Sequence, residues 1–382
     1  MCGRGTDGYG TILPAVLEAC KAGIIGSLLV ATRHSESFST FDKKLGYLNK
    51  LMGTAVRYEG YSLTSRSNVN AYRDAIRDLL SPAAVIIATP DHLHTEMALA
   101  AIERGNHVMV VKPLAPTVSE ARKLIYAAEN AGVYGAVEFH KRWDWANLKL
   151  KSVLSEGRIG EPLYFHVEYS QRKLMPTQIF ADWVEHTNIF QYLGVHYVDL
   201  IHFVTGAIPK RVLAIGQRNW LMKKGIPTYD AIEVLIEWSK GFTSTILTHW
   251  VDPNNNSAMS QQMIKAIGTA GNLSSDQTHR GVQLITDEGG IEDINPYFCQ
   301  VYPDVESEQS HYRGYGIESI TQFLNDVVTI ATGAHTPIDF EGRRPTFRSS
   351  LVSTAVIEAV NLSLIHRNRW FGFDEDMQPS LI

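Results

Sequence analysis

The 382-residue sequence has few cysteines, no long hydrophobic run and no excess of positive charge. Its three cysteines, Cys2, Cys20 and Cys299, are too few and too scattered for a disulfide scaffold or a zinc cluster. No run of about 18 apolar residues is present, so we expect no membrane span. The formal net charge of -5 gives no reason to expect a nucleic-acid partner. The start lacks the basic and apolar segments of a secretory signal. These absences favour a protein of the reducing cytoplasm.

What the chain does contain is the composition of a soluble folded protein, with 45% hydrophobic and 20% charged residues. Its length suggests two domains. Over residues 1–140, short apolar runs alternate with amphipathic stretches, which predicts a Rossmann-type, doubly wound parallel sheet. From about residue 160, longer strand patterns follow one another, which predicts a mainly antiparallel open sheet. We therefore predict an α/β protein with domains at 1–140 and 141–382, whose last helices pack back toward the first domain.

A glycine motif at the start predicts a nucleotide site. Gly3, Gly5 and Gly8 spell G-x-G-x-x-G, and a predicted helix starts near Thr11. In a dinucleotide-binding unit such glycines make a tight turn and let the backbone approach a pyrophosphate, which the helix N-terminus then binds. A glycine-rich tail is the alternative, because only two residues precede Gly3 where a buried strand is usual. Since a central strand supplies several buried side chains, we expect the natural chain to start earlier, with about five to eight apolar residues before Cys2.

The end of the next predicted strand, Ser27–Thr32, bears on the choice of nucleotide. It is followed by Arg33, His34 and Ser35, with no carboxylate before Glu36. An acidic residue at this place accepts the ribose hydroxyls of NAD, whereas arginine and serine donate hydrogen bonds that suit a 2′-phosphate. The sequence therefore favours NADP. NAD stays the alternative, because Glu36 could serve it and Arg33 could be a solvated surface charge.

The most informative motifs lie between Ala88 and Gly132. One predicted strand ends in Thr89-Pro90-Asp91-His92-Leu93-His94, and the next ends in Val111-Lys112-Pro113. Further motifs, in chain order, are EFHKRW (138–143), LSEGRIGEPLYF (154–165), GVHYVDLIHFVTG (194–206) and IKAIGTAGNLSSD (264–276). In this order they closely resemble the Gfo/Idh/MocA oxidoreductases, the family of glucose-fructose oxidoreductase and inositol dehydrogenase. The resemblance spans nearly the whole chain.

The resemblance implies an activity as well as a fold. Members of the family move a hydride between a nicotinamide and a carbinol carbon of a sugar, sugar derivative or cyclitol. The resemblance implies that Lys112 lies beside the reacting oxygen and that His196 is the acid/base, and both roles are chemically sound. It further places Thr89, Pro90 and His94 at the nucleotide, together with Lys112.

Two positions depart from the family pattern. Val111 replaces the glutamate before Lys112, and Tyr192 stands where the family often has an aspartate, four residues before His196. A phenol can share a proton relay or orient a hydroxyl but carries no charge at neutral pH, and we count Tyr192 among the catalytic candidates. Asp199, on the same helical face as His196, is expected to orient the imidazole or bind substrate. The departures leave two alternatives open: a non-catalytic nucleotide-binding sensor, and a member that reduces an imine or conjugated substrate.

Other candidate contacts are polar and aromatic residues near the expected cleft, which suit the hydrogen bonds and ring stacking of a polyol. They are His140, Lys141, Arg142, Arg172, Trp183, His186 and Asn188. No cluster with metal-ligand spacing accompanies His92 and His94, so we expect no metal. Because an open sheet usually needs cover on its exposed face, we expect a homo-oligomer, a dimer or tetramer, packed through the second domain.

Overall fold

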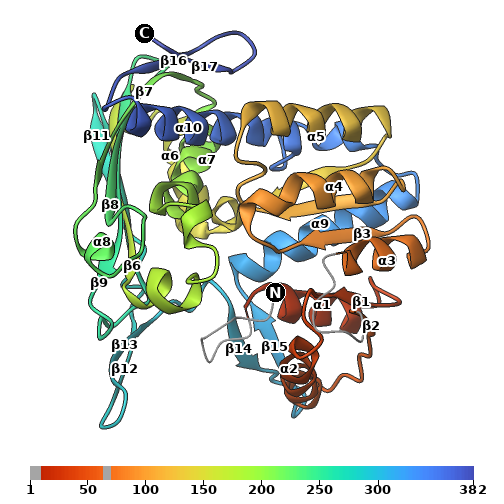
Figure 1. Ribbon diagram of the computed structural model, residues 1–382. Helices are drawn as coiled ribbons and strands as arrows, with labels where there is room; N and C mark the ends of the chain where they lie inside the picture. Colours follow the sequence, from red (N-terminus) through yellow and green to blue (C-terminus); the bar gives the residue numbers. More distant parts are fainter. Residues whose placement is uncertain (1–9, 63–69) are drawn as a thin grey trace.

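The computed structural model describes residues 10–62 and 70–382 and shows two sheets with helices around and between them (Figure 1). The motif glycines Gly3, Gly5 and Gly8, and the expectation about what precedes Cys2, lie outside the described residues. In Figure 1 the N-terminal half is on the right and the large C-terminal sheet is seen edge-on at the left.

The N-terminal half alternates strands and helices, and its strand pairs are parallel. This half contains α1 (Ile12–Lys21), β1 (Leu29–Ala31), α2 (Ser37–Met52), β2 (Glu59–Tyr61), α3 (Ala71–Asp78), β3 (Ala84–Ile87), α4 (His94–Ile102), β4 (His107–Val111), α5 (Val118–Asn130) and β5 (Gly135–Glu138). Within the described residues β1 pairs with β2, while β3, β4 and β5 form a separate three-stranded sheet. The apolar run that predicted a buried strand at 107–111 is β4, of which Val108, Met109 and Val110 are buried.

The C-terminal half is built on an eight-stranded sheet in the order β11-β10-β6-β9-β8-β7-β16-β17. Its strands are β6 (Pro162–Arg172), β7 (Pro209–Gln217), β8 (Ala231–Trp238), β9 (Thr243–Asp252), β10 (Ser260–Gly268), β11 (Gly271–Asp276), β16 (Phe371–Phe373) and β17 (Pro379–Leu381). All neighbouring pairs are antiparallel except β6 with β9. The prediction of a Rossmann-type domain followed by a mainly antiparallel sheet is confirmed.

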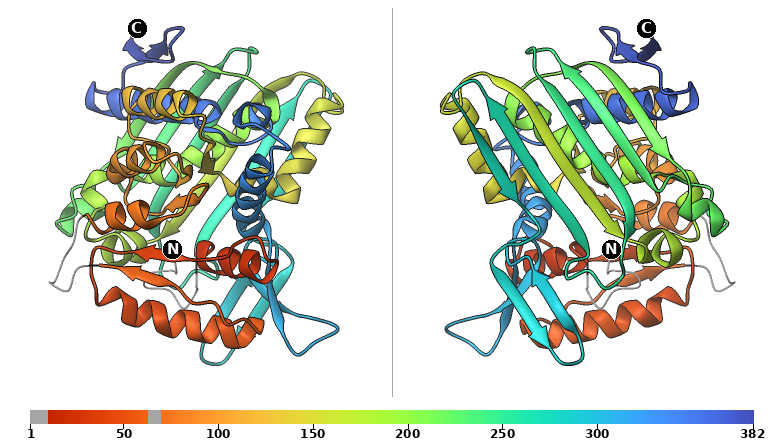
Figure 2. Two further views of the ribbon diagram at one scale, coloured as in Figure 1. Left: turned by 90° about the vertical axis from the view of Figure 1, so that its right-hand side faces the viewer. Right: turned by 90° about the vertical axis from the view of Figure 1, so that its left-hand side faces the viewer.

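One face of this sheet is covered and the other is open. Along β9 every second residue is buried, as a strand with one covered face requires. The covering helices are α6 (Trp145–Ser155), α7 (Val195–Thr205) and α10 (Phe347–Ile365), which lie between the sheet and the N-terminal half (Figure 1). In the right-hand view of Figure 2 no helix covers the other face. Short elements at the rim are α8 (Trp220–Lys223) and the projecting hairpin β12 (Val282–Thr286) and β13 (Gly290–Ile294).

After residue 299 the chain returns to the N-terminal half. The hairpin β14 (Gln300–Pro303) and β15 (Ser310–Arg313) leads into α9 (Tyr315–Ala331). Ile320 and Phe323 of α9 belong to the same buried cluster as Leu13 and Leu17 of α1. Helix α10 packs against both α5 and β7 and so bridges the halves. The start of α7 lies close to the carboxyl ends of β4 and β5.

Candidate active site

Lys112 follows directly after β4, where a cis peptide bond joins it to Pro113. Nucleotides bind parallel sheets at this carboxyl edge. Its Nζ donates to the carbonyl oxygen of Tyr192 at 2.5 Å and lies 3.5 Å from the centre of the Tyr192 ring. Burial lowers the pKa of Lys112 to about 8, although the carboxylates of Asp91 and Glu138 oppose the shift. The lysine can therefore gain and lose a proton near neutral pH.

A π-helical turn, η5 (Phe190–Gly194), brings Tyr192 onto the lysine immediately before α7. Such wide turns are frequent at functional sites. The Tyr192 ring packs edge-on against Phe180, with ring centres 4.6 Å apart. Burial raises the pKa of Tyr192 above its usual value, and the Asp91 carboxylate adds to this, so the phenol stays protonated. Tyr192, predicted as catalytic, thus contacts Lys112 through its ring face and its backbone carbonyl.

His196 lies in the first turn of α7 and is 3% exposed. Burial lowers the pKa of His196 well below its ordinary value, and the neighbouring basic side chains of His140, Lys112 and Lys141 lower it further. Among the residues that the structure describes, its Nδ1 has no hydrogen-bond partner. The imidazole is therefore neutral at physiological pH, which is the form that accepts a proton.

Two buried carboxylates near the lysine were not identified as site residues from the sequence. Asp91, 4% exposed, accepts hydrogen bonds from Thr187 Oγ1 at 3.1 Å and Gln191 Nε2 at 2.7 Å. Glu138, the last residue of β5 and 6% exposed, lies beside His140. Both raise the pKa of Lys112, so they supply the negative charge that the family pattern has at position 111. Their positions could have indicated them, because each lies in one of the sequence motifs at or just after the end of a strand.

Thr89 follows β3 and His94 is the first residue of α4, and the two differ in what they offer a nucleotide. His94 is fully buried, and its Nδ1 and Nε2 lie 2.8 and 2.9 Å from the carbonyl oxygens of Pro113 and Thr89. Both ring nitrogens are therefore engaged within the protein, and His94 holds the loop that carries Lys112; its expected contact with the nucleotide stays a prediction. The buried Oγ1 of Thr89 has no partner within the described ranges. An unpaired hydroxyl beside Lys112, at the carboxyl edge of parallel strands, fits a nicotinamide nucleotide.

Arg142 and Asp199 form a buried ion pair with each other. Arg142 Nε and Nη2 lie 2.9 and 2.6 Å from the two Asp199 oxygens, and Nη2 also donates to Ser349 Oγ at 2.9 Å. Their side chains are 6% and 2% exposed. Because both carboxylate oxygens are bound by Arg142, Asp199 does not orient the imidazole of His196. Each side chain thus has a structural partner, and the substrate roles expected of Arg142 and Asp199 stay predictions.

Two more substrate candidates also bond within the protein. Asn188 Nδ2 donates to Asn361 Oδ1 at 2.7 Å. The Arg172 guanidinium donates to the carbonyl oxygen of Ala258 at 3.1 Å and to that of Asn256. These contacts hold loops together, and the substrate roles expected of Asn188 and Arg172 stay predictions. Trp183 remains near the lysine, since its ring centre is 6.4 Å from that of Tyr192.

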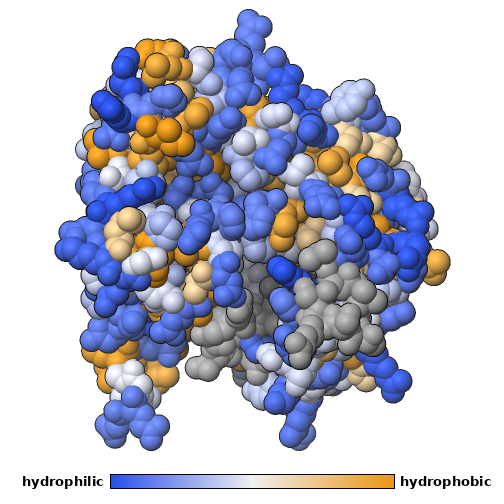
Figure 3. Space-filling view, in the orientation of Figure 1, coloured by the Kyte–Doolittle hydropathy of each residue, from blue (hydrophilic) through white to orange (hydrophobic). Residues whose placement is uncertain are grey.

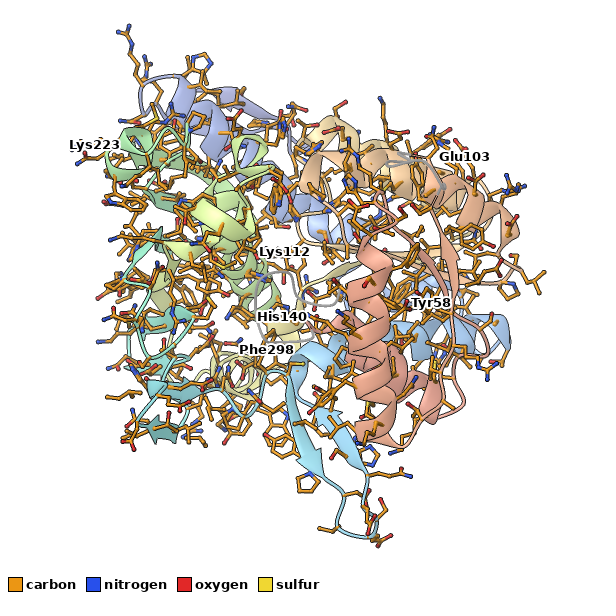
Figure 4. The ribbon with its side chains drawn as sticks, turned by 60° about the horizontal axis from the view of Figure 1, so that its bottom comes forward. Tyr58, Glu103, Lys112, His140, Lys223 and Phe298 are labelled. Atoms are coloured by element: carbon orange, nitrogen blue, oxygen red, sulfur yellow. The ribbon has the colours of Figure 1, made fainter. Side chains whose placement is uncertain are left out.

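The residues expected at the nucleotide ribose lie apart from this cluster. Arg33, His34 and Ser35 are exposed and join β1 to α2. His34 Nδ1 is 3.9 Å from Glu36 Oε1. The residues described contain no group of three or more side chains able to hold a metal ion. Figure 4 shows Lys112 and His140 close to the centre of the molecule, where the two halves meet, with Phe298 below them.

The chain was compared with family models. Residues 20–139 match the oxidoreductase family with an NAD-binding Rossmann fold, and residues 147–274 match the GFO/IDH/MocA C-terminal domain. The chain belongs to the Gfo/Idh/MocA oxidoreductase family. The resemblance seen in its motifs is thereby confirmed over both halves of this family member.

Curated relatives of this Gfo/Idh/MocA protein are cyclitol and sugar enzymes. It is 34% identical to a 1,5-anhydro-D-fructose reductase of Ensifer adhaerens over 37% of this chain and 44% of that one. It is 30% identical to a scyllo-inositol 2-dehydrogenase (NADP(+)) of Bacillus subtilis over 41% and 43%. The match thus spans less than half the length of these two relatives. A myo-inositol 2-dehydrogenase of Thermotoga maritima is 23% identical over 80% of this chain and 88% of that one.

Solved structures share the fold. A myo-inositol 2-dehydrogenase from Lactobacillus plantarum superposes with a TM-score of 0.66, at 16% identity, over 92% of each chain. A scyllo-inositol dehydrogenase from Lactobacillus casei with bound NAD(H) and scyllo-inositol gives 0.63, at 15% identity, over 89% of each.

Proposed function

We propose that this protein is an NAD(P)-dependent oxidoreductase that acts on a carbinol or carbonyl carbon of a sugar, sugar derivative or cyclitol. The observation that carries the proposal is the pairing of Lys112, whose pKa is about 8, with a neutral, buried His196 at the nucleotide edge of a parallel sheet. The activities named for the relatives support it. A bound nicotinamide would accept or supply the hydride.

Side chains of this protein carry out the proton transfer and stabilise the developing charge. When a carbinol is oxidised, its hydroxyl proton must leave, and the neutral His196 imidazole is able to take it. The Lys112 ammonium stabilises the negative charge that develops on the same oxygen. The Tyr192 ring lies against the lysine, and Phe180 and Trp183 pack around that ring, so these side chains limit the access of water. In reduction the same groups act in reverse.

NADP is the proposed nucleotide. Arg33 and Ser35 are exposed between β1 and the N-terminus of α2, and a helix N-terminus adds amide donors for a phosphate. NAD remains the alternative, because Glu36 lies in the same segment and the relatives include both NADP(+) and NAD(+) enzymes. We expect Arg33→Ala to lower the NADP-to-NAD preference in kcat/KM about tenfold, the worth of one charge-assisted hydrogen bond. An unchanged preference would contradict the choice of NADP.

The partners are a small polyol or sugar and, in a homo-oligomer, further copies of the chain. The uncovered sheet face exposes Tyr164 and Ile215, and the hairpin β12–β13 exposes Leu284, Ile285 and Ile291. Apolar side chains appear at several places along this flank (Figure 3). Light scattering is expected to give a dimer or tetramer, and a monomer would contradict the proposal. In the described residues no helix is long and apolar enough to cross a bilayer. A cytoplasmic location and the absence of membrane and nucleic-acid partners stay predictions.

The non-catalytic sensor is not favoured, because Lys112 and His196 are both retained. The test is a fluorescence titration with NAD and NADP, then assays at the nicotinamide absorbance with myo-inositol, scyllo-inositol and 1,5-anhydro-D-fructose. Binding of a nucleotide and turnover of at least one polyol or sugar are expected. Binding without turnover would support the sensor, and near-native turnover by His196→Ala would support the imine or conjugated-substrate alternative.

A further inference from the structure

A carboxylate–imidazole pair, Glu138 and His140, lies beside His196, and the proton transfer described above does not use it. His140 Nδ1 is 3.0 and 3.1 Å from the two carboxylate oxygens of Glu138, which accept its proton. The centres of the His140 and His196 rings are 4.7 Å apart. The two imidazole rings therefore pack against each other, and Nδ1 of His140 is bound to a carboxylate.

Contacts from β5, from α9 and from Phe298 hold the pair in place. Glu138 ends β5 and also accepts a hydrogen bond from Ser319 Oγ of α9 at 2.8 Å. The His140 ring stacks on Tyr315, with ring centres 5.6 Å apart, and contacts Phe298 at 5.2 Å. The His140 side chain is 14% exposed, whereas His196 is 3% exposed. His140 is thus the imidazole nearer to solvent.

The protonated form of His196 is unstable in this site. After taking a proton from a substrate hydroxyl, its ring faces the ammonium groups of Lys112 and Lys141, which repel the new charge. No carboxylate lies at its Nδ1 in the described parts of the chain. His140, by contrast, has its counter-ion in place, because a carboxylate on one nitrogen stabilises an imidazolium. A proton that moves from His196 to His140 moves toward both charge compensation and water.

We propose that Glu138 and His140 form a proton relay for His196. In oxidation His196 takes the proton of the substrate hydroxyl, His140 receives that proton from His196 and releases it to solvent, and Glu138 stays ionised throughout; reduction runs the same path backwards. The relay rests on the proposed function. Both residues act through His196 and are positioning residues. The titratable groups that face the two imidazoles are Lys112, Glu138, Lys141, Tyr169 and Tyr315.

The first test is Glu138→Gln, which keeps a hydrogen-bond acceptor but removes the charge, with the exposed Glu103→Gln as its matched control. We expect kcat for oxidation to fall about 10- to 100-fold, a part of the usual worth of acid–base catalysis. We also expect a larger solvent isotope effect. The acid limb of the kcat/KM profile should move to lower pH, because the protonated relay loses its counter-ion. A merely structural role would lower the rate without moving the limb.

The second test is His140→Ala, which should lose a similar factor and regain part of it with added imidazole. Circular dichroism and nucleotide titration establish that each variant is folded. A third readout needs no turnover: in ¹⁵N-histidine-labelled protein, His140 should protonate before His196 as the pH falls, and Glu138→Gln should narrow that gap.

The outcomes separate the two proposals. If the wild-type protein oxidises a polyol while Glu138→Gln leaves the rate, the acid limb and the order of protonation unchanged, the relay alone is wrong. If the wild-type protein binds a nucleotide but converts no polyol or sugar, the proposed function is wrong, and the relay with it.

Discussion

His196 and Asp199 lie three residues apart on α7, and both are buried, yet their surroundings differ completely. Both oxygens of Asp199 are bound by Arg142 in a bidentate pair. His196 has basic side chains around it and no partner at Nδ1 in the described residues. A buried charged group whose partners are all present stabilises the structure, whereas a buried titratable group that lacks a partner gains or loses its proton easily. The first pair should therefore matter for stability and the second group for catalysis.

The largest effect is expected at Lys112. Replacing it by methionine removes the ammonium beside the reacting oxygen, and kcat/KM should fall by about 10³-fold or more. Nucleotide binding and the unfolding transition should be retained. The matched control is Lys123→Met on the exposed face of α5, which should keep full activity. If Lys112→Met kept more than a tenth of the wild-type rate, the lysine would not act at the reacting oxygen.

Arg142→Met should act on stability instead. It leaves the Asp199 carboxylate buried without its partner, which typically costs about 3–5 kcal/mol in the free energy of unfolding. The double variant Arg142→Met/Asp199→Leu should recover most of the loss. Arg348, which pairs with Glu129 at the exposed surface, is the control, because such pairs contribute only about 0–1 kcal/mol. Urea unfolding of the four proteins is the measurement, and equal losses for Arg142→Met and Arg348→Met would contradict the assignment.

This contrast also shows what the sequence alone could predict. The apolar run at 107–111 predicts a strand and the helical spacing at 118–130 predicts a helix, and both elements form there. Polar residues dilute the pattern after residue 42, so the sequence predicts no helix there, yet α2 forms with Phe41, Leu45, Leu48 and Met52 buried at helical spacing. The sequence predicts a strand near 56–58, and the structure has β2 at Glu59–Tyr61 instead.

The sequence predicts a site residue where a motif contains it. It does not predict the role of a residue whose hydrogen-bond or ionic partner lies far away in the chain. Lys112 and His196 came from motifs. For Arg142 and Asp199 the sequence shows two charges 57 residues apart but not that they pair. Glu138 was overlooked for the same reason, since Ser319, one of its partners, lies 181 residues away.

A smaller effect is expected on the pH dependence of the free energy of unfolding, because Lys112 is buried. Burial holds the pKa of Lys112 at about 8 in the folded state, below its ordinary 10.5. Between these values the unfolded chain binds more protons than the folded one, so the free energy of unfolding contributed by this group rises with pH. Relative to Lys112→Met, the wild-type protein should gain on the order of 2 kcal/mol between about pH 8 and about pH 10. Parallel stability curves for the two proteins would show that Lys112 is not desolvated.

The smallest effect is expected at Tyr192. Its ring face lies 3.5 Å from Lys112 Nζ and its backbone carbonyl accepts the ammonium proton. Both contacts survive in Tyr192→Phe, because phenylalanine keeps the ring and the backbone. Tyr192→Phe should therefore change kcat less than about threefold, whereas Tyr192→Ala, which removes the cation–π contact, should lower it further.

The kinetics of these two variants, with circular dichroism as a check on folding, would decide how Tyr192 acts. A loss of about 100-fold in Tyr192→Phe would mean that the hydroxyl itself exchanges protons during the reaction. The burial that raises the pKa of Tyr192 argues against that role, because a phenol held in its protonated form can donate a hydrogen bond but is a poor base.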